Sequence, residues 1–361
     1  MSRSQSVAVL GAGIVGLSCA WLLQRHGYQV QLVDPCLGGP PPTHSGSAAA
    51  LGVLMAQVFH RNSGRAWRLR QQSLQLWRDW LEELTSRGHT ISRREGLLLL
   101  AADPQELERQ QTLVNLRRAL GFPLELWPPH RLEEFQPDLP AAALGGLYSP
   151  LDGQVDPNET MAALLTDALS HGLAVHATAA AAISRRGLGQ WTVDCTNGER
   201  LRPHWVVLAA GVASCTLAAQ LGYDIPMEPV LGQALEFELK GSVHWNWPGA
   251  VVWRGLNLVP RPDLEGRHRF WLGATLEPGE LADPAELSKL QHWAGAELSW
   301  LNSARVKRQW QGWRCRPVGR PAPVLEQLEA GMIVTSGHYR NGVLLAPASA
   351  RWVMEQVEAG D

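Results

Sequence analysis

Near its N-terminus the chain carries glycines in a Gly-x-Gly-x-x-Gly pattern, and an acidic residue follows about 20 residues further on. The glycines are Gly11, Gly13 and Gly16, and the acidic residue is Asp34. In this pattern the first glycine allows a tight turn, the second lets the backbone approach a pyrophosphate, and the third lets a helix pack closely against a strand. The carboxylate can accept hydrogen bonds from ribose hydroxyls. These residues predict an adenine dinucleotide site, and the pattern leaves FAD and NAD both open.

To bind a dinucleotide, these residues must lie on a strand, a turn, a helix and a second strand. Apolar residues 7–10 predict a buried parallel strand that ends at the glycines. Residues 14–26 carry apolar side chains at helical spacing, and Gly27 is placed to end the helix. Residues 29–33 predict a second strand that ends at Asp34. The N-terminus of the helix would then offer free N–H groups to the phosphates.

Length and composition describe an ordinary globular protein. The chain has 361 residues, which at about 150 residues per domain favours two domains. Hydrophobic residues make up 45% and charged residues 18%, which excludes a disordered chain. The 32 Lys and Arg residues nearly balance 34 Asp and Glu residues, and the net charge of -2 argues against a nucleic-acid partner.

The sequence also argues against several other kinds of site. None of the lysines, Lys240, Lys289 and Lys307, lies in a Gly-Lys-Ser/Thr triplet, so the sequence has no P-loop. The five cysteines include no Cys-x-x-Cys pair, which argues against a metal site or a disulfide framework and fits a reducing cytoplasm. We interpret the apolar run 7–23 as part of the dinucleotide motif, because glycines interrupt it, and not as a signal peptide or membrane span.

The remaining chain alternates between predicted helices and strands. Segment 230–274 is rich in strand formers and predicts an antiparallel sheet. The predicted helices cover 64–87, 104–120, 157–169 and a segment beginning near Val343, and the predicted strands cover 96–100, a stretch near Val175, 191–195, 205–210 and 332–336. We expect the arginines of the first of these helices, and the one just before it, to form a face exposed to solvent. They are Arg61, Arg65, Arg68 and Arg70.

This order divides the dinucleotide domain into separated pieces. We assign 1–85, 150–224 and 315–361 to that domain, and 86–149 and 225–314 to a second one. The fold class is therefore predicted as α/β plus α+β, with a discontinuous Rossmann-like domain and a substrate domain built on an antiparallel sheet. Simple NAD dehydrogenases usually have a contiguous Rossmann unit, so the discontinuity favours a flavoprotein and FAD.

Several motifs along the chain carry a resemblance to a known family. They are GAGIVG at 11–16 with Asp34, GQVDP at 153–157, VLAAG at 207–211, GAT at 273–275 and GHYRNG at 337–342. In this order they resemble the D-amino-acid oxidase family of FAD-dependent oxidoreductases, and most closely its glycine oxidase branch. The stretch 337–347, GHYRNGVLLAP, is the most specific of them. The resemblance implies a non-covalently bound FAD and an antiparallel sheet that roofs the flavin.

The resemblance also implies which residues bind FAD. A helix that begins in the turn 339–343 would aim N–H groups at the pyrimidine edge of the flavin and favour its anionic reduced form. His338 is assigned no proton transfer. The expected FAD-binding residues are Gly11, Gly13, Ile14, Val15, Gly16, Asp34, Ala210, Gly211, His338, Tyr339, Arg340, Asn341, Gly342 and Val343.

The chemistry implied by the resemblance is oxidation of glycine or a small D- or N-methyl amino acid. Hydride passes from Cα to the flavin, the imine hydrolyses to an oxo acid and ammonia, and oxygen is reduced to hydrogen peroxide. Such an activity could serve thiamine biosynthesis. In this family no side chain is required as general base if the amine binds in its neutral form.

A carboxylate in a dry pocket calls for a guanidinium, because its planar fork makes two charge-assisted hydrogen bonds. The segment 310–317, WQGWRCRP, resembles the glycine oxidase segment that carries this arginine. Counting from Trp310 selects Arg314, which we favour, whereas anchoring on the Arg-Pro pair selects Arg316. If the segment is a strand, both arginines project to one face. Arg340 is expected to make a second polar contact near the substrate.

Two residues depart from the glycine oxidase pattern. Asn257 stands where that branch places a pocket tyrosine, so a larger or N-substituted amine could be accepted. Cys315 replaces an expected proline beside the carboxylate site. We therefore count Asn257 with Arg314, Arg340 and Arg316 as the candidate catalytic residues.

Two other functions stay open. One is an FAD-dependent dehydrogenase or oxidase of a larger or secondary amine, similar to sarcosine or proline. The other is a flavin-binding protein without amine turnover. The expected partners are a small amino-acid substrate and molecular oxygen, with no nucleic acid and no transmembrane segment; a homo-oligomer is left open, and the expected location is the cytoplasm.

Overall fold

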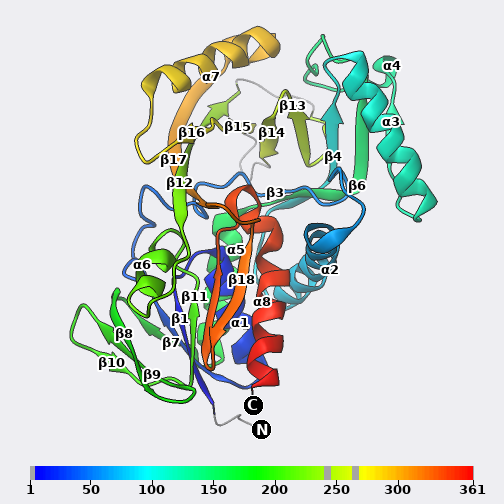
Figure 1. Ribbon diagram of the computed structural model, residues 1–361. Helices are drawn as coiled ribbons and strands as arrows, with labels where there is room; N and C mark the ends of the chain where they lie inside the picture. Colours follow the sequence, from blue (N-terminus) through cyan, green and yellow to red (C-terminus); the bar gives the residue numbers. More distant parts are fainter. Residues whose placement is uncertain (1–4, 240–244, 262–267, 361) are drawn as a thin grey trace.

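The computed structural model describes residues 5–239, 245–261 and 268–360. Two large sheets dominate the fold. A six-stranded sheet lies in the lower half of Figure 1, near both termini, and a ten-stranded sheet lies in the upper half. The candidate site residues lie where these two sheets meet.

The six-stranded sheet is built around the dinucleotide motif. Its strand order is β18-β19-β11-β1-β2-β7, and neighbouring strands are parallel except for β18, which runs antiparallel to β19. The bounds are β1 (Ser6–Leu10), β2 (Gln29–Val33), β7 (Ala174–His176), β11 (Trp205–Leu208), β18 (Val324–Glu329) and β19 (Met332–Ser336). Strands from the start, the middle and the end of the chain therefore lie side by side.

Alternate residues of β1 pack on the two faces of this sheet. Val7 and Val9 belong to the core under the helices α1 (Ile14–Arg25), α2 (Gly64–Ser86), α5 (Pro157–Ser170) and α8 (Gly342–Ala359). Ala8 and Leu10 belong to the opposite core, under α6 (Ala213–Ala219) and the small sheet of β8 (Ala180–Gly187), β9 (Gln190–Cys195) and β10 (Arg200–Leu201). Because both faces are covered, residues 7–10 of the strand are all apolar.

The ten-stranded sheet has the order β16-β12-β15-β14-β13-β4-β6-β3, with β17 paired to β12 and β5 paired to β6. Its strands are β3 (Val53–Leu54), β4 (Arg93–Leu100), β5 (Glu125–Trp127), β6 (Gly146–Val155), β12 (Met227–Glu238), β13 (Ala250–Trp253), β14 (Leu256–Arg261), β15 (Arg269–Gly273), β16 (Glu277–Pro278) and β17 (Arg305–Pro317). The helices α3 (Pro104–Ala119), α4 (Pro129–Leu132) and α7 (Pro284–Glu297) flank it, and the 3₁₀ turns are η1 (Ser299–Ser303) and η2 (Tyr339–Asn341).

Tryptophans form much of the core between this sheet and α7. The ring of Phe270 lies 5.9 Å from that of Trp247 and 5.3 Å from that of Trp300, both in edge-to-face contact. Leu290 and Ala294 of α7 belong to the same core. This aromatic packing buries the face of the sheet that α7 covers.

The motif 153–157 braces the junction of the two sheets. Asp156 accepts hydrogen bonds from the backbone N–H of Asn158 at 2.8 Å and of Glu159 at 3.0 Å, so it caps α5. Its other oxygen forms an ion pair with Arg261 of β14. The motif therefore joins a helix of the first sheet to a strand of the second.

The predicted fold class is confirmed, with two differences in detail. The antiparallel sheet predicted for 230–274 is larger, because β3, β4 and β6 join it and β13 runs parallel to β4. Residues 240–244, which include Lys240, and 262–267 lie outside the described part. The solvated face predicted for the arginines of α2 is wrong for Arg70, which is 9% exposed and packs on the ring of Phe59.

All five cysteines are free. Among the described residues, no helix has the length and hydrophobicity needed to cross a membrane. The assignment of 1–85, 150–224 and 315–361 to one domain, and of 86–149 and 225–314 to the other, remains our proposal.

Candidate functional site

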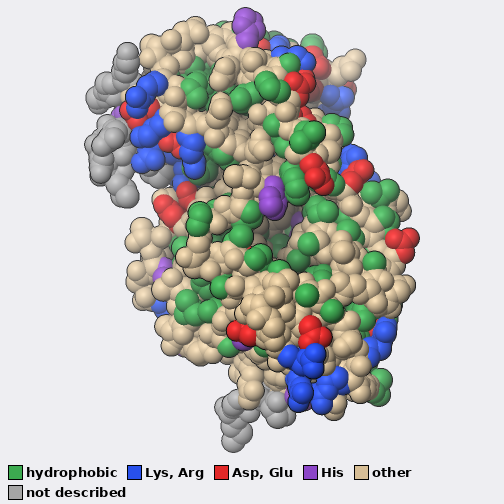
Figure 2. Space-filling model, turned by 90° about the vertical axis from the view of Figure 1, so that its left-hand side faces the viewer, with side chains coloured by type: hydrophobic (Ala, Val, Ile, Leu, Met, Phe, Trp, Pro, Cys, Tyr) green, Lys and Arg blue, Asp and Glu red, His purple; other side chains and the backbone are tan. Residues whose placement is uncertain are grey.

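A cavity of about 1480 Å³ is lined by both large sheets. From the first sheet come the C-terminal ends of parallel strands and the residues that follow them, 10–15, 33–39, 209–213 and 335–340. From the second sheet come Gly232, 254–257, 274–276 and 312–315. Figure 2 shows one side of the molecule hollowed at mid-height, where hydrophobic side chains gather. In open α/β sheets ligands bind at this edge, outside the carboxyl ends of the strands.

The glycines of the first turn lie where a side chain would collide. Gly11 has a φ of 107°, and a Cβ built on it would lie 2.6 Å from the carbonyl oxygen of Ala209. A Cβ on Gly16 would overlap the carbonyl oxygen of Gly11. Gly13 is the N-cap of α1 and provides no side-chain cap. The start of α1 therefore presents bare backbone to the cavity.

Two side chains organise this turn. Asp34 accepts hydrogen bonds from the backbone N–H of Ala12 at 2.9 Å and of Cys36 at 2.8 Å. Ser47 Oγ accepts one from the N–H of Ile14 at 3.0 Å. Asp34 and Ser47 both line the cavity, and each oxygen of Asp34 keeps a lone pair for a further donor. Asp34 can therefore still accept a hydroxyl group of a ligand.

Segment 44–49, which contains Ser47, also contacts the opposite wall. The N–H of Trp313 donates to the carbonyl oxygen of His44 at 3.0 Å, and the two rings stack with centroids 4.5 Å apart. A Cβ on Gly46 would overlap the carbonyl oxygen of Trp313. Because Arg314 follows Trp313 in β17, this segment joins the start of α1 to the strand that carries the candidate carboxylate ligand.

Arg314 lies in the cavity wall, against strand β12. Its Nη1 donates to the carbonyl oxygen of Leu231 at 3.0 Å, and a Cβ on Gly232 would lie 2.5 Å from Cζ of the guanidinium. Burial and the neighbouring Arg340 lower the pKa of Arg314. In the described part of the chain no carboxylate forms an ion pair with this arginine.

Arg316 lies on the same face of β17 as Arg314, as expected for two residues separated by one position in a strand. It forms an ion pair with Glu228 across the β12–β17 pair, and this partner raises the pKa of Arg316. Its Cζ lies 5.9 Å from the ring centroid of Tyr339. Among the described residues, Arg316 is outside the set that lines the cavity.

The turn between β19 and α8 carries the most specific motif. Gly337 and Tyr339 adopt positive φ angles of 65° and 53°, which reverse the chain after the strand. Arg340 and Gly342 line the cavity, so α8 begins there. Asn341 instead accepts a hydrogen bond through Oδ1 from Nη2 of Arg70 at 3.0 Å.

His338 is buried in this turn, with 6% of its surface exposed. Its Nε2 lies 2.8 Å from the hydroxyl of Ser349 in α8. Burial, with a smaller contribution from Arg65, lowers the pKa of His338 to about 3. The imidazole is therefore neutral at neutral pH, and its one described side-chain partner is a hydroxyl group.

Asn257 of β14 lines the cavity, and it lies between Val252 and Gly273 of the neighbouring strands. Within the described residues no group hydrogen-bonds its amide. Thr275 accepts a hydrogen bond from the N–H of Gln233 at 2.7 Å. The wall opposite the glycine turn therefore has one free amide and one hydroxyl that is held in place.

Most of the predicted site residues come together at this cavity. Those that line it are Gly11, Gly13, Ile14, Val15, Asp34, Ala210, Gly211, Asn257, Arg314, His338, Tyr339, Arg340, Gly342 and Val343. Gly16, Arg316 and Asn341 are not among the residues that line the cavity. Sequence reasoning missed Ser47 and Gly232. A glycine inside an apolar strand is a signal of close approach by another group, and Gly232 carried that signal.

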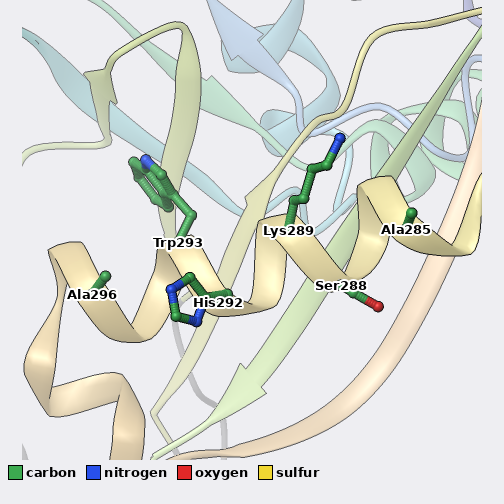
Figure 3. Close-up of a pocket in the computed structure, with 6 residues that line it drawn as sticks. All are labelled: Ala285, Ser288, Lys289, His292, Trp293 and Ala296. Carbon is green, nitrogen blue, oxygen red and sulfur yellow. The ribbon is translucent and has the colours of Figure 1, made fainter.

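A second hollow, on α7, differs in character. It is lined by Ala285, Ser288, Lys289, His292, Trp293 and Ala296. In Figure 3 Lys289 and Ser288 point to different sides of the helix. Lys289 forms an ion pair with Glu286, its neighbour on the same helix. The polar groups of this hollow do not converge on one point, in contrast to those of the cavity.

Comparison with known proteins agrees with this geometry. The family described as FAD dependent oxidoreductase matches residues 6–356. The chain is 28% identical to the glycine oxidase of Geobacillus kaustophilus, over 99% of this chain and 94% of that protein. It is 26% identical to the bifunctional protein ThiO/ThiG of Synechocystis, over 99% of this chain and 52% of that protein. The crystal structure of the Geobacillus glycine oxidase superposes with a TM-score of 0.86 at 27% identity, covering 99% of this chain and 96% of that one.

The residues present fit FAD. The bare turn at Gly11 and Gly13 can receive a pyrophosphate, Asp34 can accept ribose hydroxyls, and the start of α8 lies further along the same cavity. The cofactor of this protein is FAD. The chain belongs to the family of FAD-dependent oxidoreductases.

Proposed function

We propose that this protein is an FAD-dependent oxidase of glycine or another small amino acid. One amine, one molecule of oxygen and one water would give an oxo acid, ammonia and hydrogen peroxide. The observation that best supports this proposal is the partly buried guanidinium of Arg314, which has no carboxylate partner among the described residues. A buried cation is costly unless it is paired, so a substrate carboxylate would supply the missing charge.

The cofactor supplies the hydride acceptor. In the proposed reaction Arg314 binds the carboxylate, Arg340 makes a second polar contact, and both fix Cα within the cavity. The first N–H groups of α8 favour negative charge in the part of the cavity that they face. The remaining expected FAD contacts, from Gly11 to Val343, form part of this same proposal.

His338, which lines the same cavity as Arg314, is not suited to remove a proton from the substrate at neutral pH. His338 has a pKa of about 3 because it is buried, so it is a poor proton acceptor there. We therefore infer that the amine binds in its neutral form. The ammonium group of a free amino acid must lose its proton in solution, and the apparent affinity of the substrate should rise with pH.

Asn257 favours a second candidate within the same chemistry. Its amide lines the cavity without a described partner and is small, so it leaves space for a substituent on the amine. Secondary amines similar to sarcosine or proline are therefore the alternative substrates, with oxygen or another acceptor. A relative from Rhizobium etli, named putative thiamine biosynthesis oxidoreductase ThiO and 27% identical to this chain, supports a place in thiamine biosynthesis. A cytoplasmic location belongs to the same proposal.

The test is an anaerobic absorbance spectrum of the purified protein, recorded while glycine, sarcosine, D-alanine and proline are added separately. The proposal expects glycine to bleach the flavin band, and air to restore it with release of hydrogen peroxide. Bleaching by sarcosine or proline alone would transfer the assignment to secondary amines. A flavin band that no amine bleaches would overturn both assignments and leave a flavin-binding protein without amine turnover.

A further inference from the structure

Helix α8 contains a proline close to its start. The helix begins at Gly342 and carries Pro347 inside it. Proline has no backbone N–H, so it cannot bond to the carbonyl group four residues earlier, which belongs to Val343. Val343 lines the cavity, so the missing bond lies in the turn of the helix that faces the cavity.

Helix α2 supplies the missing donor. Nε1 of Trp77 donates to the carbonyl oxygen of Val343 at 3.0 Å and to that of Leu344 at 3.1 Å. The side chain of Trp77 is 1% exposed. Figure 1 shows α2 lying beside α8. The indole therefore takes the place of the backbone donor that Pro347 lacks.

Ser73 lies one helical turn before Trp77 in α2 and contacts the same part of α8. Its hydroxyl donates to the carbonyl oxygen of Leu344 at 2.6 Å and accepts from the N–H of Ala348 at 3.2 Å. Ser73 is fully buried and lies four residues before Trp77, so both side chains project from one face of α2. The hydroxyl bridges a donor and an acceptor on either side of Pro347.

Arg70 extends this face to the residue before α8. Its Nη2 donates to Oδ1 of Asn341 at 3.0 Å, and its Cζ lies 4.1 Å from the ring centroid of Phe59. Burial lowers the pKa of Arg70 to about 10, so the guanidinium stays charged at neutral pH. Arg70, Ser73 and Trp77 thus hold residues 341, 343 and 344 from one side.

We propose that Arg70, Ser73 and Trp77 are positioning residues that set the reduction potential of the bound FAD. They act through the start of α8, whose N–H groups favour negative charge on the reduced cofactor only while they are held in a fixed direction. This inference rests on the proposed placement of the flavin against residues 339–343. It does not depend on which amine is oxidised.

The experiment measures the midpoint potential of the holoprotein by reduction in the presence of a reference dye, without any amine. The test variant is Trp77→Phe, which removes the indole N–H and keeps an aromatic ring. The matched control is Trp80→Phe, because Trp80 lies on the same helix, is 4% exposed, and contacts the rings of Trp21 and Trp77. No hydrogen bond joins Trp80 to α8 among the described residues.

Trp77→Phe is expected to lower the equilibrium constant for reduction about tenfold, which is about 30 mV for a two-electron couple. Trp80→Phe is expected to leave the potential unchanged, even if it lowers the melting temperature by a similar amount. Equal shifts in the two variants, or no shift in Trp77→Phe, would overturn the proposal. If Trp77→Phe does not fold, Ser73→Ala carries the same expectation.

A second substitution tests whether the backbone N–H that Pro347 lacks is the cause of the shift in potential. In Trp77→Phe with Pro347→Ala, residue 347 regains an N–H that can bond to the carbonyl oxygen of Val343. The potential is then expected to return towards that of the parent protein, and a potential that stays low would contradict the assigned role of the indole. A parent protein that no amine reduces, but whose potential shifts in Trp77→Phe, would overturn the proposed function and leave this inference standing.

Discussion

The guanidinium of Arg314 lies against the backbone of Gly232, where a Cβ would approach its Cζ to 2.5 Å. The two residues are on adjacent antiparallel strands, since Arg314 pairs with Val230 and Gly232 pairs with Gly312. The place of the charged group therefore depends on the absence of a side chain on the neighbouring strand. An arginine-binding surface of this kind is made by a strand glycine and not by an acidic residue.

Gly232→Ala is expected to displace the guanidinium and weaken binding of the substrate carboxylate. Loss of a charged hydrogen bond is worth about 1.5–3 kcal/mol, so KM for the amine should rise about 10- to 100-fold, with a smaller change in kcat. Steady-state kinetics and the Kd of a carboxylate inhibitor check this result. The control is Gly187→Ala, where a Cβ on the strand would meet only the Gln190 side chain, at 3.9 Å. An unchanged KM in Gly232→Ala would contradict the role of the contact.

Replacing each candidate arginine by methionine separates the two sequence alignments. Arg314→Met removes a partly buried guanidinium from the cavity wall, and we expect a loss of at least ~100-fold in kcat/KM. Arg316→Met removes a partly exposed ion pair with Glu228, and pairs of this kind contribute at most about 1 kcal/mol to stability. We expect its kcat/KM to stay within about threefold of the parent value. The opposite ranking would assign the carboxylate to Arg316.

The glycine turn can be tested by retention of FAD. Gly16→Ala places a methyl group on the carbonyl oxygen of Gly11, which is backbone and cannot rotate away as a side chain can. Gly13→Ala meets the hydroxyl of Ser47 at 3.0 Å, which a side-chain rotation can relieve. We expect Gly16→Ala to lose most of its flavin absorbance on gel filtration and Gly13→Ala to retain more. Full retention of the flavin in Gly16→Ala would show that close packing of α1 is not required.

His338 predicts a specific pH dependence of stability. Folding lowers the pKa of His338 from 6.5 to about 3, so between these values the unfolded chain binds the proton and the folded chain does not. The contribution of neutral His338 to the free energy of unfolding is therefore fully present above pH 6.5. The free energy of unfolding falls as the pH drops, by about 2 kcal/mol at pH 5. Urea unfolding of the parent protein and of His338→Gln at pH 8 and pH 5 measures this term. The variant should lose about 2 kcal/mol less than the parent, and equal losses would refute the burial argument.

The first unit of the fold was predictable because its signal is local. In residues 7–34 the spacing of the apolar side chains and the positions of the glycines predict a strand, a turn, a helix and a second strand. The structure has each of these elements. Long helices such as 64–87 were found for the same reason. The later strands at 205–210 and 332–336 were predicted from their apolar character, and the structure shows their order beside β1.

What the sequence could not show depends on contacts between distant residues. Arg70 was predicted as a solvated residue because a charged residue on a helix usually is one, but Asn341 and Phe59 surround it in the fold. Ser47 lies in a run of small residues whose hydrophobic side chains have no helical or strand spacing. Its hydroxyl finds a hydrogen-bond donor, the N–H of Ile14, only because the start of α1 lies beside it in the fold. Arg314 and Arg316 project to the same face of one strand, so their spacing does not show which of them lines the cavity. Their neighbours in the fold distinguish them, because Arg314 lies against Gly232 and Arg316 pairs with Glu228.

The strand order has a consequence for biosynthesis. The glycine turn of β1 and α1 leaves the ribosome before β17, β19 and α8 do. β19 pairs with β11 next to β1, and Trp313 of β17 fixes the segment that bonds to the start of α1. The cavity therefore cannot be completed until residues 305–359 have been translated. Retention of the cofactor must wait for these elements, and a product truncated before them would expose the turn without being able to retain its ligand.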